Sequence, residues 1–112
     1  YSDFTRLLLH EKCPTVCLSE SCFGYYRLNT INFLGRKIDF VPGKKFYSFG
    51  TGNGWSSNII TFVENKLIHV QNGHRRLVAV AEFTEDELVL TLSMEDIVAR
   101  RHFVRQDSIC YC

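Results

Sequence analysis

The 112-residue sequence has almost no excess of either charge, with 13 lysines and arginines against 12 aspartates and glutamates. A formal net charge of +1 gives no long-range attraction toward nucleic acid or an anionic membrane, so neither is expected as a partner. The sequence also lacks any apolar run near the roughly 20 residues that a helix needs to span a bilayer. Stable membrane insertion is therefore not expected.

Proline is scarce as well, with 2 in the chain, and no internal repeat or linker is visible. Hydrophobic residues make up 46% and aromatic residues 13%, which excludes a disordered chain. The length suits a single domain, residues 1–112, with one core. Many short runs of β-branched and aromatic residues predict an all-β fold.

The clearest predicted element is a hairpin over residues 58–71. Ile59–Val63 and Lys66–Gln71 are rich in β-branched residues and meet at Glu64-Asn65, a two-residue break typical of hairpins, where Asn65 tolerates positive φ. The strand that contains residues 59–63 is expected to open at Trp55. The other predicted strands are Gly24–Ile31, Arg36–Val41, Lys44–Phe49, His74–Phe83, Glu87–Met94 and Ile97–Arg105.

Eight antiparallel strands in succession predict an up-and-down β-barrel of the calycin or lipocalin kind, because closure removes exposed strand edges. A short amphipathic helix is expected at Ser2–His10 and an irregular segment at Cys13–Cys22. A barrel of this size either packs its interior with side chains or holds one small ligand.

The 5 cysteines gather at the two ends of the chain, at positions 13, 17 and 22 and at positions 110 and 112. This placement predicts disulfides that join the first segment to the last, and an oxidising compartment, hence secretion, with a reduced cytoplasmic protein as the alternative. The odd count leaves one thiol unpaired or available for a disulfide-linked dimer. The spacing matches no common zinc site, so no metal or other cofactor is expected.

The alternation along three strands indicates which side chains share a face of the barrel. Leu88, Leu90 and Leu92 share one face, as do Leu67, His69 and Gln71, whereas Ile97–Arg105 has Arg101 on one face and Arg100 on the other. Burying an arginine without a partner costs several kcal/mol. A cavity that contains water and an anionic ligand would remove this cost.

Residues 32–105 resemble the intracellular lipid-binding protein family, which includes the fatty-acid-binding and retinoid-binding proteins. The matching blocks are Phe33, Ile38–Phe46 with the pattern Ile-x-Phe-x-x-Gly-x-x-Phe, Lys66–Gln71, Leu88–Leu92 and Asp96–Phe103. The resemblance implies a non-catalytic β-barrel that encloses a fatty acid, a retinoid-like molecule or a similar amphiphile beneath a helical lid.

The same resemblance implies roles for individual residues. Arg101 falls on the family's carboxylate-binding arginine, Phe103 on its partner tyrosine, and Ala81 near a second family arginine. The remaining expected ligand contacts are the cavity residues Leu90 and Leu92, the inward polar residues Gln71 and His69, and Phe33 in the portal loop.

The chain also departs from the family at its two ends. The first family strand, with its Gly-x-Trp, is absent, and we hypothesise that the cysteines fasten the two ends in its place. A secreted, cysteine-stapled domain with a filled core, acting through protein–protein contacts, is the alternative function. An enzyme is not expected, because none of the 4 histidines stands in a motif with a nucleophile and an orienting group.

Overall fold

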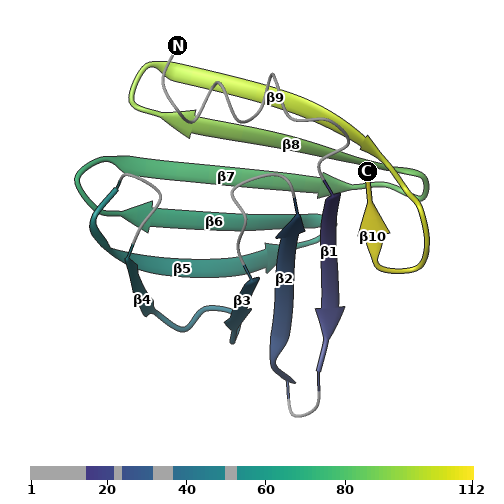
Figure 1. Cartoon of the computed structure of the whole chain (residues 1–112), viewed down its shortest axis with the longest axis horizontal. Helices are drawn as coiled ribbons and strands as arrows, with labels where there is room; N and C mark the ends of the chain where they lie inside the picture. The colour runs from purple at the N-terminus through teal and green to yellow at the C-terminus, as the bar shows by residue number, and fades with distance from the viewer. Residues whose placement is uncertain (1–14, 22–23, 32–36, 50–52) are drawn as a thin grey trace.

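The computed structural model describes residues 15–21, 24–31, 37–49 and 53–112. These residues form ten β-strands and no α-helix, and no helix among them is long and apolar enough to cross a membrane (Figure 1). The strands are β1 Thr15–Glu20, β2 Tyr26–Ile31, β3 Lys37–Phe40, β4 Phe46–Phe49, β5 Trp55–Val63, β6 Lys66–Asn72, β7 Arg76–Phe83, β8 Glu87–Met94, β9 Ile97–Val104 and β10 Cys110–Tyr111. Strands β2 to β9 match the eight predicted strands. The helix expected at Ser2–His10 lies outside the described residues.

The strands form two antiparallel sheets, in the orders β10-β1-β2-β3 and β4-β5-β6-β7-β8-β9. Each strand of the six-stranded sheet pairs with the next one in the chain, which confirms the up-and-down meander. In the β5–β6 turn the left-handed residue is Glu64, with φ 56°, and not Asn65 as its residue type suggested.

The prediction of an irregular segment between Cys13 and Cys22 was wrong, because this segment contains β1. Along its whole length β1 pairs with β2, and its other edge pairs with β10. Val16 is buried and Leu18 packs against the core, so the strand has the inward alternation of a barrel wall. Pairing with β2 along its length, and with β10 at Val16 and Cys17, gives its backbone groups hydrogen-bond partners.

A strand of 2 residues near the C terminus, β10, joins the two sheets (Figure 1). It pairs with β1, and its neighbour Cys112 exchanges two backbone hydrogen bonds of 2.8 and 2.9 Å with Val104 at the end of β9. Tyr111 forms a further bridge to Arg105. On this side the two sheets therefore make one continuous wall.

The turn before β10 is fixed by two charged side chains. The Asp107 carboxylate accepts hydrogen bonds from the backbone N–H groups of Ile109 and Cys110, both at 2.9 Å, and these bonds lower the pKa of Asp107. The guanidinium of Arg105 donates to the backbone carbonyls of Asp107, Glu85 and Ser108. Together they direct the chain back along β9 and toward β1.

A disulfide between Cys17 in β1 and Cys110 in β10 joins positions 93 residues apart. Cys112 is disulfide-bonded as well. The Cys17–Cys110 bond confirms the predicted link between the first segment and the last. Because β10 also fills the position between β1 and β9, strand and disulfide together support the hypothesis that this end of the chain fastens the barrel.

Both sheets contribute to the core, which lies between them. The buried apolar residues are Val16, Phe40, Ile60, Leu67, Ala81, Leu88, Leu90, Leu92, Phe103 and Tyr111. The rings of Tyr26, Phe40 and Phe62 connect the sheets across the interior, with centroids 4.9 to 6.1 Å apart. Aromatic packing therefore closes part of the barrel on the side where β3 ends.

Candidate functional site

Strand register arranges the inward side chains of the six-stranded sheet in four rows. The Phe103 row contains Phe83, Leu88 and Phe103, and the Arg101 row contains Phe62, Leu67, Ala81, Leu90 and Arg101. The Ala79 row contains Ile60, His69, Ala79, Leu92 and Ala99, and the Gln71 row contains Phe46, Asn58, Gln71, Leu77, Met94 and Ile97. Every predicted ligand contact except Phe33 lies in these rows. Phe33 is outside the described residues.

Of the two neighbouring arginines in β9, Arg101 faces inward. Its neighbour on the same face, Phe103, is completely buried, whereas Arg100 and His102 are exposed on the opposite face. The guanidinium carbon of Arg101 lies 5.9 Å from the centre of the Phe103 ring, within the range of a cation–π contact. On the inward face a cation thus lies next to the apolar ring of Phe103.

Burial changes from row to row along the barrel. In the Phe103 row, Leu88 and Phe103 are both fully buried, and Phe83 is partly buried. Further along, Ala79, Ala99 and Leu77 point inward yet stay only partly buried. Two of these three side chains are single methyl groups, which occupy little of the interior. Beyond Arg101 the inward face thus combines these partly buried side chains with the buried Ile60 and Leu92.

His69 and Gln71 belong to a polar network on the β4–β6 side of the interior. The side-chain oxygen of Asn58 accepts a 2.9 Å hydrogen bond from Gln71 Nε2 and lies 2.8 Å from His69 Nε2. The side-chain nitrogen of Asn58 donates to Ser48 Oγ at 2.9 Å, and that of Asn53 donates to Gln71 Oε1 at 3.1 Å. Within the described part of the chain, no buried side-chain nitrogen or oxygen is left without a partner.

The sequence prediction included His69 and Gln71 but missed the residues that hold them. Asn53, Ser56 and Asn58 are buried polar residues at the start of β5 and just before it. A signal was present, because Ser56 and Asn58 alternate with Ser57 and share their face with buried Ile60. Polar residues at such positions are usually read as solvent-facing. Their burial makes one wall of the interior polar and the β7–β9 wall apolar around one arginine.

Comparison with known proteins identifies proteins that are similar to this chain. No protein-family model matches the chain. A fatty acid-binding protein of Tyrophagus putrescentiae is 26% identical over 103 residues, which cover 91% of this chain and 79% of that protein. The name of this relative supports neither the predicted secretion nor the predicted disulfide-linked dimer.

Solved structures agree with the sequence comparison. The fatty acid-binding protein from brain tissue of Drosophila melanogaster superposes with a TM-score of 0.76 at 29% identity, covering 82% of this chain and 72% of that one. The Schistosoma mansoni fatty acid binding protein, solved in complex with arachidonic acid, gives a TM-score of 0.73 at 21% identity, covering 84% and 71%, and supports the fold. The chain is therefore similar in sequence to the fatty acid-binding proteins and shares their β-barrel fold.

Proposed function

We propose that the barrel interior binds a fatty acid or a similar amphiphile, with the ligand's acidic group at Arg101. The observation that carries this proposal is the inward position of Arg101 among Leu90, Ala81 and Phe103, next to inward side chains that remain partly accessible. An apolar face with one cation complements a molecule that has an apolar chain and one anionic end. The relatives named as fatty acid-binding proteins support the same ligand class.

Each part of the interior has a role in this proposal. A charge-assisted hydrogen bond between Arg101 and a carboxylate contributes roughly 1.5–3 kcal/mol. Phe103 stands where the family has a tyrosine, so its ring supports the guanidinium and supplies no hydroxyl donor to the ligand. Leu92 and Ala79 provide apolar surface for the chain, while Gln71 and His69 face it from the polar wall.

We infer a carrier and not an enzyme from the surroundings of His69. Its Nε2 atom lies 2.8 Å from the side-chain oxygen of Asn58. An amide oxygen orients the imidazole ring but is not a nucleophile that the ring could activate. In this arrangement His69 serves as a polar contact for the ligand.

Displacement of a fluorescent fatty acid from the purified protein tests the proposal. Arg101→Gln is expected to weaken binding by roughly 10- to 100-fold, because a charge-assisted hydrogen bond is lost. Arg100→Gln is the matched control, since it removes the same charge from the adjacent, outward position, and it should leave the affinity unchanged. The methyl ester of the same fatty acid should bind both variants equally. Equal affinities of the free acid for the two variants would rule out Arg101 as the anchor, and no binding to the unmodified protein would favour the filled-core alternative.

A further inference from the structure

The Cys17–Cys110 disulfide lies on the outward side of the barrel wall. Its two cysteines are directly opposite each other in the β1–β10 pair. Val16 and Leu18, on either side of Cys17, pack in the core, and Tyr111, the neighbour of Cys110, is buried. Strand alternation therefore turns both cysteine side chains outward, and both residues are partly exposed. Exposed disulfides are reduced more readily than buried structural ones.

Without this disulfide, few contacts hold β10 against β1. Two register pairs join the strands, and the Leu18 amide donates one further hydrogen bond of 2.9 Å to the Ile109 carbonyl. A strand of 2 residues gains little from backbone pairing alone. On its other side, next to β9, the chain exchanges two backbone hydrogen bonds between Cys112 and Val104 (Figure 1). Reduction of Cys17–Cys110 therefore frees β10 from β1 first.

Strand β10 carries one side chain into the core, the ring of Tyr111. This ring is 6% exposed, and its centroid lies 5.5 Å from that of Phe83 in an edge-on contact. Phe83 is opposite Leu88 in the sheet, and Leu88 is opposite Phe103. The guanidinium carbon of Arg101 lies 5.9 Å from the centre of the Phe103 ring. A row of core side chains thus connects β10 with the proposed ligand anchor.

We propose that thiol–disulfide exchange at Cys17–Cys110 regulates ligand binding in the barrel, and this proposal rests on the function proposed above. In the oxidised protein the disulfide holds β10 against β1 and keeps the Tyr111 ring on Phe83. In the reduced protein β10 detaches from β1, the ring leaves the core, and the position of Arg101 is less well fixed. The oxidised form therefore retains the amphiphile and the reduced form releases it. Strand β10, attached or detached, is the two-state element on which both the redox state and the ligand act.

The switching step is an exchange with a dithiol. One thiolate of the dithiol attacks a sulfur of the Cys17–Cys110 bond, forms a mixed disulfide and expels the other cysteine as a thiolate. The second thiolate of the dithiol attacks the mixed disulfide, closes the dithiol's own disulfide and expels the second cysteine. Two electrons pass from the dithiol to the protein, and the two protons that the dithiol loses end on Cys17 and Cys110.

Titration of the oxidised and the reduced protein with a fluorescent fatty acid tests the switch. Dithiothreitol without denaturant should make Cys17 and Cys110 reactive toward iodoacetamide, as peptide mass spectrometry detects, while the circular dichroism stays that of a folded β protein. Affinity should fall by roughly 2- to 10-fold on reduction, the size of one lost aromatic contact. Equal affinities of the two forms, reduction that needs denaturant, or unfolding on reduction would overturn the proposal. No binding by the oxidised protein would instead overturn the proposed function.

A serine variant separates this disulfide from the one that contains Cys112. Cys17→Ser combined with Cys110→Ser leaves the Cys112 bond in place when no reductant is present. This double variant should bind the fatty acid with the affinity of the reduced protein. If it binds like the oxidised protein, any effect of dithiothreitol belongs to Cys112, and the proposal is wrong.

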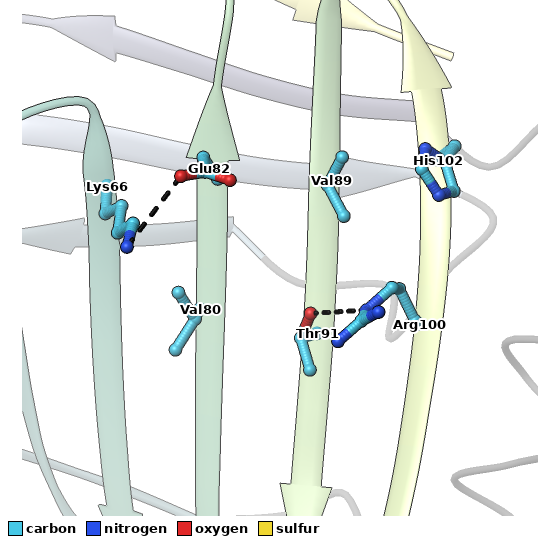
Figure 2. A pocket seen from close by; sticks show the side chains of 7 residues that line it. All are labelled: Lys66, Val80, Glu82, Val89, Thr91, Arg100 and His102. Carbon is cyan, nitrogen blue, oxygen red and sulfur yellow. Dashed lines mark hydrogen bonds and ion pairs between the residues drawn. The ribbon is translucent and has the colours of Figure 1, made fainter.

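Tyr111→Ala tests whether β10 acts through its buried ring. In the oxidised protein this variant should show the same loss of affinity as reduction. Val89→Ala is the matched control, because Val89 follows Leu88 in β8 but points outward, into a groove of about 340 Å³ that Val80 and His102 also line (Figure 2). The control should bind like the unmodified protein. An equal loss in both variants would contradict a specific connection through Tyr111.

Discussion

Reduction of the protein's disulfides is expected to lower the free energy of unfolding by about 4–5 kcal/mol. The Cys17–Cys110 bond closes a loop whose ends are 93 residues apart, and in the chain-entropy model a loop of this length contributes about 4.7 kcal/mol. The loss should also have a local signature. Because β10 has 2 residues, its backbone pairing alone is a weak fastener between β1 and β9.

Urea denaturation followed by circular dichroism, with and without dithiothreitol, measures this loss. Hydrogen exchange adds the local signature, because the Leu18 amide donates to Ile109 and the Val104 amide donates to Cys112. Both amides should lose protection on reduction, while the amides that pair β6 with β7 keep it. The double variant Cys17→Ser and Cys110→Ser serves as a control without reductant. Coincident denaturation curves for oxidised and reduced protein would show that the disulfides do not fasten the barrel.

Ala79→Phe is expected to abolish most ligand binding while the protein remains folded. Ala79 points inward and is only partly buried, so under the proposed function a larger side chain there takes up space that the ligand would occupy. The phenyl ring would displace about four methylene groups of a ligand, each worth about 0.8 kcal/mol, so affinity should fall by roughly 100-fold or more. Fatty acid titration of the purified variant measures this effect.

The matched control is Val78→Phe, which adds the same ring to the outward side of the same strand. It should leave fatty acid affinity unchanged. The two variants also distinguish a hollow interior from a filled one. If side chains already filled the space beside Ala79, the added ring would overpack the core and destabilise the protein by about 1–3 kcal/mol. A destabilised Ala79→Phe variant, next to a stable Val78→Phe variant, would contradict the proposed binding space.

The meander from β2 to β9 could be predicted because each of its strands carries its own signal. Alternation along β8 puts Leu88, Leu90 and Leu92 on one face, and the turns after β5 and β8 are short and polar. Neighbours in such a sheet are also neighbours in the chain, so local pattern is enough to give the order of the strands. The same alternation separates Arg101 from Arg100.

The two ends of the described chain could not be predicted in the same way. A strand as short as β10 has no detectable periodicity, and its position is set by a disulfide, by Asp107 and by pairing with β1 far away in the sequence. The strand character of β1 was hidden by the cysteines around it, which suggested an irregular segment. Strand β10 owes its structure to long-range contacts, which local sequence does not record, whereas β1 pairs along its whole length with its neighbour in the chain, β2.

The functional surfaces were predictable to different degrees. Arg101 was accessible to prediction because strand alternation and family resemblance both indicate it. The buried Asn58 was not, since its role depends on hydrogen bonds to His69 and Gln71 from a neighbouring strand.

The most direct test of ligand binding inside the barrel is a crystal structure of the protein with a fatty acid that carries bromine at the end of its chain. We predict an anomalous bromine peak in the interior, beside Ala79 and Leu92, with the carboxylate in contact with the guanidinium of Arg101. A bromine peak confined to the outside of the barrel, or an interior filled by side chains with no density for the ligand, would contradict the proposed carrier.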